Sequence, residues 1–367
     1  MRINFEFGTL SRWFGVLFAT ASLLTAHPVQ AAEKQDPCRA SFAGRTLRWI
    51  VPSAPGGGMD TYSRLITPIY ARALGTEIVV ENRAGAGGIS GATAIRDSRP
   101  DGATLGLVNG PGLLVASLTG ELSAPNPATE FTVLARVASS RHVWATGANS
   151  GLNTLSDVFT EAEKRPIIFG VREVGGTAFV NIAVTTSLLG VDRKIVAGFR
   201  GNLDTTLAAV RGDVDLVTYT FESIRNQIVS EDLRPILQVS AVPISSDPLL
   251  DEVPLLGGEQ GVAASRASVL GRDTSEAVRD AGALSALIGA GRIVVAPLGL
   301  DSQIQRCMEE ALDISLTSDV FRATAANAHR SLNLASSDQA LAELQAAVAR
   351  ADRFFPIVRE AIREVRE

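Results

Sequence analysis

The sequence predicts an α/β fold with two units, and two observations carry this prediction. Short apolar segments alternate with helical segments along most of the chain, which is typical of parallel strands whose connecting helices cover both faces of a sheet. Two glycine-rich turns, at 53–60 and 81–91, each follow an apolar run and precede a helical pattern. The 367 residues, less a short leader, are also enough for two ordinary domains.

The first unit begins with a strand predicted at 47–51. We expect Asp60 to cap the next helix, in which the apolar residues share one face, and Pro68 to kink it or delay its start. The elements that follow are a strand at 78–80, a helix at 91–97 and a strand at 104–108.

After a proline-containing loop, a strand predicted at 131–137 leads out of the first unit. The second unit has strands predicted at 167–169, 194–197 and 214–219. Gly175, Gly176 and Thr177 form a turn that enters a helix after the first of these strands. The stretch 262–289, rich in Ala, Ser and Arg, is harder to place, and we interpret it as an inserted helical hairpin.

Apolar residues recur at alternating steps of three and four between Leu341 and Val365. A coiled-coil partner helix would show this pattern, but barely four heptads are present and they follow a globular chain. The pattern therefore favours one long amphipathic helix that packs on its own domain.

The first 32 residues predict an export signal. Arg2 and Arg12 precede an apolar run at 13–26, and small residues allow cleavage near Ala31. An uncleaved anchor is the alternative, but the run is shorter than the roughly 20 apolar residues of a membrane-spanning helix. We therefore expect an exported, soluble mature protein.

Composition argues against several partners and cofactors. A net charge of −5, without a basic cluster that includes aromatic residues, predicts no binding to nucleic acid. His142 and His329 stand isolated, without the spacing of metal ligands, so we expect neither a metal nor another cofactor. Cys38 and Cys307 either form a disulfide or stay separate thiols, and the sequence leaves both possibilities open.

Three blocks carry a resemblance to a known family: PSAPGGGMD at 52–60, VVENRAGAGG at 79–88 and PDGATL at 100–105. In order and spacing they resemble the Bug-type solute receptors of tripartite tricarboxylate transporters. The similarity is strong to about Gly110 and fainter in the rest of the chain.

The resemblance implies a two-lobed periplasmic binding protein of the type II, Venus-flytrap kind, with a parallel-rich sheet in each lobe. We assign residues 40–140 and 290–367 to lobe 1, and residues 141–289 to lobe 2. It also implies a small carboxylated ligand in a cleft between the lobes, held mostly by backbone N–H groups and water. The implied partners are membrane transporter subunits, the implied location is the periplasm, and we expect a monomer without catalytic activity.

On this resemblance, the two walls of the cleft are helix N-termini, whose partial positive charge suits a carboxylate. The predicted ligand-binding residues are Ser53, Pro55, Gly57, Gly58, Asp60, Asn109 and Gly110 on one wall, and Arg172, Gly175, Gly176 and Thr177 on the other. Asp60 has a purely structural alternative as a helix cap. Arg172, bulky where the family has small residues, either contacts a carboxylate or forms a solvated pair with Glu173.

Two other function classes stay open. A receptor that serves a sensor kinase would have the same features. An exported nucleotide-dependent enzyme is less favoured, because the last glycine of 85–91 comes one position late for a dinucleotide fingerprint. Hydrolase chemistry lacks a G-x-S-x-G motif, and neither His142 nor His329 is next to a candidate nucleophile.

Overall fold

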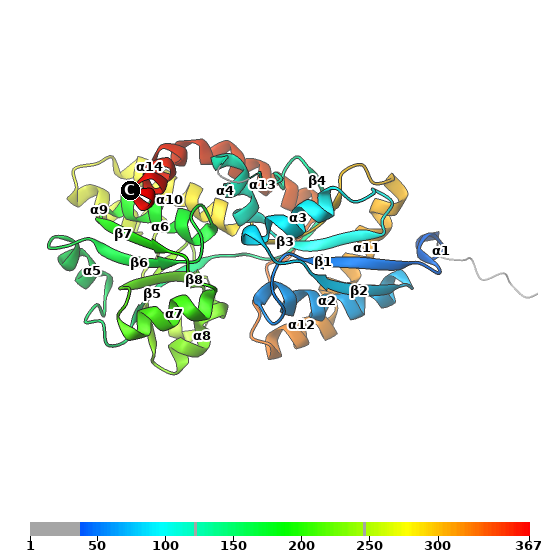
Figure 1. Ribbon diagram of the computed structural model, residues 1–367, viewed down its shortest axis with the longest axis horizontal. Coiled ribbons are helices and arrows are strands. Elements are labelled where there is room, and N and C mark those ends of the chain that lie inside the picture. Colours follow the sequence, from blue (N-terminus) through cyan, green and yellow to red (C-terminus); the bar gives the residue numbers. More distant parts are fainter. Residues whose placement is uncertain (1–36, 121–122, 245–246) are drawn as a thin grey trace, which may run out of the picture. The chain divides into compact units, whose positions relative to one another are not determined.

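Two mixed β-sheets organise the protein, and helices cover both faces of each sheet (Figure 1). The computed structural model describes residues 37–120, 123–244 and 247–367, and the expected export signal lies outside them. Pro37–Glu367 fold as one compact unit. Within the described residues, every helix is too short or too polar to cross a bilayer.

The first sheet has the strand order β11-β4-β10-β3-β1-β2. Its strands are β1 (Thr46–Val51), β2 (Glu77–Asn82), β3 (Thr104–Asn109), β4 (Phe131–Ala138), β10 (Arg292–Pro297) and β11 (Ala335–Ser336). β1 pairs in parallel with β2 and β3, as the strand–helix alternation predicted. β10 returns from a distant part of the chain and runs antiparallel between β3 and β4, so the sheet is mixed.

Helices pack on both faces of the first sheet. They are α2 (Gly58–Leu74), α11 (Ser302–Thr317) and α12 (Asp319–Asn327) on one face, and α3 (Ile89–Arg96) and α13 (Ser337–Ala351) on the other. Neighbouring strand residues therefore enter different cores: Trp49 packs with α2, and Ile50 packs with α3. α2 begins at Gly58 and continues through Pro68, so a start delayed by Pro68 is wrong, while a kink there stays a prediction. Trp49 meets Tyr70 edge-on, with ring centroids 6.0 Å apart.

A disulfide joins Cys38 of α1 (Pro37–Phe42) to Cys307 of α11, with the Cα atoms 5.2 Å apart. Of the two possibilities that the sequence left open, the structure shows the disulfide and not two separate thiols. The bond links segments 269 residues apart along the chain.

The second sheet has the strand order β7-β6-β8-β5-β9. Its strands are β5 (His142–Gly147), β6 (Ile167–Val171), β7 (Arg193–Ala197), β8 (Leu216–Thr220) and β9 (Leu233–Val239). β6 is parallel to β7 and β8, whereas β5 is antiparallel to β8 and β9. Each sheet thus has a parallel half and an antiparallel half.

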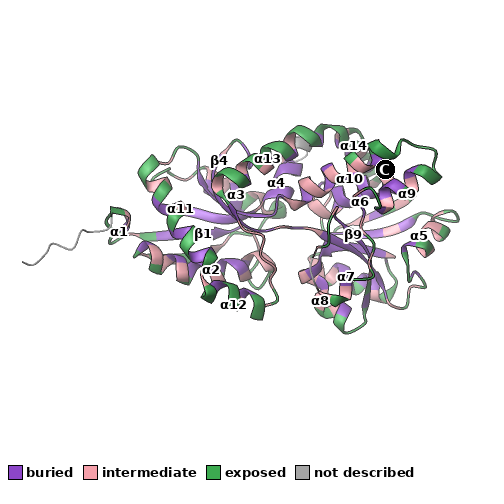
Figure 2. Ribbon diagram, turned by 180° about the vertical axis from the view of Figure 1, so that it is seen from behind, coloured by how far each residue is buried: buried purple, intermediate pink, exposed green. Residues whose placement is uncertain are grey.

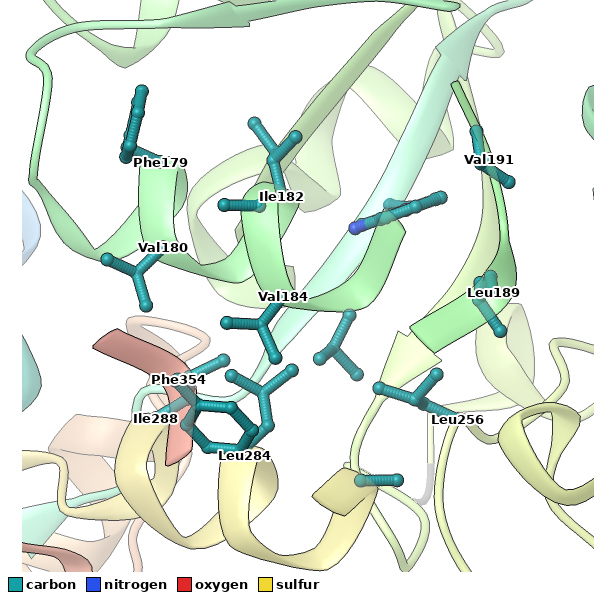
Figure 3. Packing of buried hydrophobic residues seen from close by; sticks show 14 of the residues in the cluster. Phe179, Val180, Ile182, Val184, Leu189, Val191, Leu256, Leu284, Ile288 and Phe354 are labelled. Carbon is teal, nitrogen blue, oxygen red and sulfur yellow. The ribbon is translucent and has the colours of Figure 1, made fainter. Parts of the chain in front are cut away.

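Two layers of helices enclose the second sheet. They are α7 (Asn202–Arg211) and α8 (Phe221–Val229) on one face, and α5 (Leu155–Ala162), α6 (Thr177–Leu189), α9 (Val262–Val269), α10 (Thr274–Gly289) and α14 (Phe355–Arg366) on the other. α6 is almost wholly buried, and Figure 3 shows its residues Val180 and Val184 facing Leu284 and Ile288 of α10. The burial colours of Figure 2 follow these layers, with mostly buried central strands between helices that are exposed on their outer sides.

The remaining helices are α4 (Gly110–Thr119) and three short 3₁₀ turns at Ala86–Gly88, Pro248–Leu250 and Asp352–Phe354. α4 contributes Leu113 to a core of the first sheet and Leu114 to the core of the second. α13 does the same with Leu344 and Ala351, so these two helices join the cores of both sheets.

Two C-terminal expectations meet different outcomes. The stretch 262–289 forms a helical hairpin, as interpreted, in which α9 and α10 pack together. The single long C-terminal helix is wrong: a 3₁₀ turn ends α13, and Pro356 stands in the first turn of α14, where its missing N–H costs nothing. α14 packs on α6 and β7, next to the second sheet. The lobe boundaries stay a prediction.

Candidate functional site

Two strand–turn–helix units, one in each sheet, have the same backbone geometry. β1 leads into α2 through Gly56 (φ +79°) and Gly57 (φ −75°, ψ 170°). β6 leads into α6 through Gly175 (φ +78°) and Gly176 (φ −73°, ψ 172°). A φ near +79° is the left-handed region that favours glycine. No described side chain caps either helix, so both present first-turn N–H groups at the carboxyl end of a strand.

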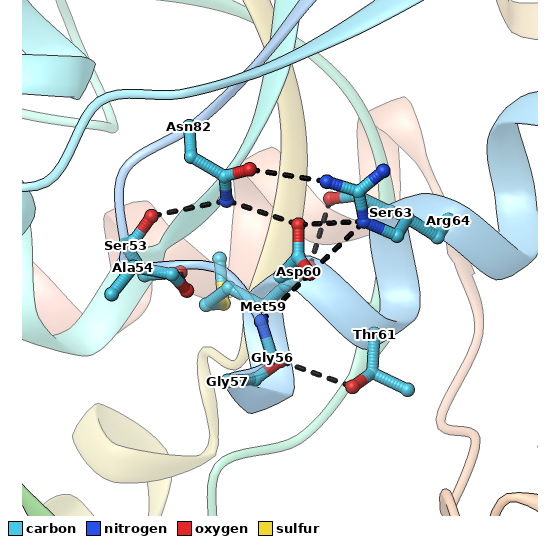
Figure 4. A network of polar contacts seen from close by, with 10 residues as sticks. All are labelled: Ser53, Ala54, Gly56, Gly57, Met59, Asp60, Thr61, Ser63, Arg64 and Asn82. Atoms are coloured by element: carbon cyan, nitrogen blue, oxygen red, sulfur yellow. Dashed lines mark hydrogen bonds and ion pairs between the residues drawn. The ribbon is translucent and has the colours of Figure 1, made fainter.

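Asp60 holds the first of these turns in place through a network of polar contacts (Figure 4). The residue is buried, with 4% of its surface exposed. It accepts hydrogen bonds from the Gly56 amide (2.9 Å), from Arg64 Nε (3.0 Å to each oxygen) and from Asn82 Nδ2 (3.0 Å). Burial alone would raise the pKa of Asp60, but these hydrogen bonds outweigh it and lower the pKa below its usual value. Asp60 is therefore ionised at neutral pH, with its acceptors occupied by the protein.

The expectation that Asp60 is the N-cap of α2 is wrong. Gly57, three residues earlier, is the N-cap, and Asp60 lies in the first turn. Its structural role nevertheless resembles capping, since it fixes the loop through the Gly56 amide. Contact between Asp60 and a ligand stays a prediction.

The turn at 85–88 lies between the two glycine turns just described. A methyl group added at Gly88 would lie 3.1 Å from the carbonyl oxygen of Pro52, and one at Gly87 would lie 3.5 Å from Oε1 of Glu173. Asn82, just ahead of this turn, also donates from Nδ2 to the Ser53 carbonyl at 3.1 Å. The loop before α2 and the turn before α6 are thus connected through a third glycine turn.

Asn109 and Thr177 bring the two predicted walls into direct contact. Asn109, the N-cap of α4, donates from Nδ2 to Thr177 Oγ1 at 3.4 Å. Its Oδ1 is buried and has no hydrogen-bond partner in the described part of the chain. Gly110 follows, and its amide donates to the Gly291 carbonyl at 2.9 Å, which fixes the start of α4 against the start of β10.

Other predicted site residues lie at the edges of this arrangement. Ser53 is half-buried and Pro55 is exposed in the loop before α2. Arg172 pairs through Nε with Glu173 Oε2 at 3.1 Å, and both side chains are well exposed. The structure thus shows the solvated pair, one of the two alternatives for Arg172, while its contact with a ligand stays a prediction.

Two arginines that no sequence motif indicated lie beside the first turn of α2. A methyl group at Gly58 would lie 3.8 Å from Arg292 Nη2 and 3.9 Å from Arg330 Nη1. Arg292 opens β10 opposite Asn109, and it lies over the ring of Tyr62 at 5.0 Å. The one available signal was an arginine directly before the apolar run Ile-Val-Val, and no motif links it to residue 330.

Burial and positive charge together shape the electrostatics here. Burial, with a smaller contribution from Arg292, lowers the pKa of His142 to about 3, so the imidazole is neutral. Burial also raises the pKa of Tyr62, whose hydroxyl donates to the Ser331 carbonyl at 2.6 Å. The described residues contain no group of three or more His, Cys, Asp or Glu that could hold a metal.

A family model gives the context for these features. Residues 63–247, half of the chain, match the model of the tripartite tricarboxylate transporter family receptor, TctC. The chain belongs to this family. The resemblance drawn from the three sequence blocks is therefore confirmed, and the family is one of solute-binding receptors.

Among curated relatives, BugT of Bordetella pertussis is 27% identical over 219 residues, which cover 58% of this chain and 64% of BugT. The chain spans 52–65% of the length of the first curated relatives that it matches. Two solved structures are similar over most of their length. MatC from Rhodopseudomonas palustris with bound malate has a TM-score of 0.63 and 23% identity, with coverage of 86% of this chain and 100% of MatC.

The periplasmic binding protein BugD has a TM-score of 0.66 and 18% identity, with coverage of 87% of this chain and 98% of BugD. At this identity the similarity shows the fold. The predicted two-lobed periplasmic binding protein fold of α/β class is confirmed.

Proposed function

We propose that this protein is an extracytoplasmic receptor that captures a small carboxylated metabolite for a tripartite tricarboxylate-type membrane transporter. In this proposal it acts in the periplasm, as a monomer, after removal of its export signal. It binds its ligand without transforming it. A receptor that passes the signal to a sensor kinase is the alternative, and it would use the same binding site.

One observation carries the proposal: the glycine turns before α2 and α6 match in backbone geometry and lie close to each other. Two helix N-termini that converge on one ligand add their partial positive charges and their free N–H donors. A carboxylate accepts hydrogen bonds from these N–H groups and is stabilised by both partial charges. Its binding there needs no buried lysine or arginine, whose desolvation would cost free energy.

The relatives support the same ligand class. MatC was solved with malate, a dicarboxylate, and its fold matches this chain over 86% of its length. An enzymatic role has less support, since the family is one of receptors and the buried Nδ1 of His142 has no hydrogen-bond partner among the described residues. The proposed ligand-binding residues are the eleven predicted from the sequence, with the two glycine turns and the Asn109–Thr177 contact at their centre.

Ligand-induced thermal stabilisation tests the proposal. The mature protein is heated with mono-, di- and tricarboxylates, each alone, and its melting temperature is recorded. A ligand present at 100 times its Kd stabilises the folded state by about 2.7 kcal/mol, which raises Tm by about 4 °C for a protein of this size. A shift with a nucleotide or an ester, and none with any carboxylate, would contradict the proposal.

Gly57→Leu is the matched variant for the site. The extended φ and ψ of Gly57 suit any residue, and the nearest atom to an added methyl group is the Ala54 carbonyl oxygen at 3.5 Å. We therefore expect a folded protein whose new side chain covers the first-turn N–H groups of α2 and abolishes the carboxylate-induced shift. Gly282→Leu in α10, where an added methyl group meets no described atom within 4 Å, should keep the shift and serves as the control.

A further inference from the structure

We propose that Arg292 and Arg330 form a second anion subsite, which binds the distal carboxylate of a dicarboxylate ligand. This inference rests on the proposed function and narrows its ligand class. The matched glycine turns account for the binding of one carboxylate. The arginine pair would add affinity for a ligand that has a second carboxylate.

Arg292 is the main group of this subsite. Its side chain is 7% exposed, and its Nη1 donates to the Ser139 carbonyl at 3.1 Å. Its guanidinium covers the Tyr62 ring at 5.0 Å, which fixes its orientation. Nη2 points to the other side, toward Gly58 at the start of α2. The carbonyl, the ring and the strand therefore hold this buried cation before any ligand arrives.

Arg330 completes the pair from a different segment, after α12. Its Nε is buried and has no hydrogen-bond partner among the described residues. Its Nη1 lies 3.9 Å from the same methyl position at Gly58 that Arg292 Nη2 approaches, so the two nitrogens are at most 7.7 Å apart. Within this limit, one carboxylate can contact both nitrogens, with one oxygen on each at an ordinary distance of about 2.9 Å.

Neither arginine forms an ion pair with a described carboxylate, although the Glu222 carboxylate acts on Tyr62 together with both arginines. Across the described residues, no carboxylate oxygen lies within 4.0 Å of either guanidinium. Asp60 is occupied by Arg64, Asn82 and Gly56, and Glu222 accepts a hydrogen bond from Ser331. Two like charges beside the positive end of a helix repel each other, and an anion between them removes that repulsion.

The pair also lies where a ligand would reach it. Arg292 opens β10 opposite Asn109 in the sheet, and Asn109 contacts Thr177 at the start of α6. A ligand whose first carboxylate lies at the N-terminus of α6 can therefore extend past Asn109 toward the arginines. His142, neutral and under the influence of Arg292, adds no competing charge.

Isothermal titration of the mature protein with paired acids tests this inference. Straight-chain dicarboxylates of three to eight carbons are compared with the monocarboxylates of equal length. We expect the best dicarboxylate to bind at least ten-fold tighter than its monocarboxylate partner, since a charge-assisted hydrogen bond to carboxylate supplies that much.

Variants connect the preference to the pair. Arg330→Gln and Arg292→Gln should each weaken the dicarboxylate at least ten-fold and leave the monocarboxylate within two-fold. Arg292→Lys keeps the charge and should retain part of the preference. Arg322→Gln, an exposed arginine on the adjacent helix α12, is the matched control and should change neither affinity. Circular dichroism and the melting temperature check that each variant is folded.

The outcomes separate this inference from the proposed function. Equal binding of both acids by the wild type, or equal weakening of both by the arginine variants, would overturn the subsite and leave the carboxylate receptor intact. If the wild type binds no acid of either series, the subsite fails. The proposed function fails as well only if the tricarboxylates also leave the melting temperature unchanged.

Discussion

Lowering the pH from 7.5 to 5 should destabilise this protein through one buried histidine. Burial lowers the pKa of His142 to about 3, compared with its usual 6.5. Its imidazole lies in β5 with 6% exposure, and its Nδ1 lacks a hydrogen-bond partner among the described residues. The folded state therefore keeps His142 neutral at a pH at which the unfolded state protonates it.

The sign follows from proton binding. Because the unfolded state binds more protons between pH 6.5 and 3, the free energy of unfolding falls as the pH falls through this window. For these two pKa values the loss between pH 7.5 and 5 is about 2 kcal/mol, with a limiting slope of about 1.4 kcal/mol per pH unit. The figure changes little for any folded pKa below about 4.5.

Urea unfolding, measured between pH 5 and 7.5, gives the slope. Trp49 and Trp144 are fully buried, one in each sheet, so their fluorescence reports the unfolding of both. Carboxylates with lowered pKa values, such as Asp60, change the pH dependence of the free energy of unfolding only at lower pH. We expect His142→Asn to flatten the slope and His329→Asn, at an exposed position, to keep it. A wild type that loses less than about 0.5 kcal/mol, or a His142→Asn variant with the full slope, would refute the reasoning.

Three further changes have expected effects on stability. Cys307→Ser removes the disulfide and should lower the free energy of unfolding by about 2–4 kcal/mol in urea, with the same loss on adding reductant to the wild type. Asp60→Asn should cost about 1–3 kcal/mol at neutral pH, because the Arg64 guanidinium loses its charged acceptor, and this cost should shrink below the usual aspartate pKa of 3.8. Gly106→Ala would place a methyl group 2.2 Å from the Ile50 carbonyl and should lower Tm by more than 5 °C in calorimetry, whereas an unchanged Tm would show that the strands can separate there.

The parallel halves of both sheets could be predicted from sequence, because they depend on local signals. Strands such as 47–51 and 167–169 are short apolar runs, and the glycines that follow mark the turns into helices. The positive φ of Gly56 and Gly175 agrees with the residue type at these positions. The two helix N-termini at the centre of the candidate site could thus be predicted from residue types and their order alone.

The antiparallel halves could not be predicted in the same way. β10 pairs with β3 and β4 across a long stretch of chain, and no local pattern specifies such a partner. The burial of Arg292 depends on that pairing, so its position beside α2 could not be predicted from the sequence either. Asp60 was assigned as the cap from residue preference, but the loop geometry gives that position to Gly57.

The C-terminal break is a different case, because its signal was present in the sequence. Pro356 interrupts the apolar repeat between Leu341 and Val365, yet the spacing alone favoured one continuous helix. Proline tolerates the first turn of a helix, so the chain restarts at α14 immediately after a 3₁₀ turn. The repeat continues across the break because both helices bury apolar residues in the core of the second sheet.

The bond between Cys38 and Cys307 also sets an order of events during biosynthesis. A ribosome or a translocation channel delivers Cys38 first, and 268 further residues must pass before its partner emerges. The early thiol therefore waits, exposed to oxidants and to foreign thiols, while most of the chain is still arriving. Since the chain has no third cysteine beyond this pair, intramolecular scrambling is impossible, and a disulfide with another molecule is the one mispairing open to the maturing polypeptide.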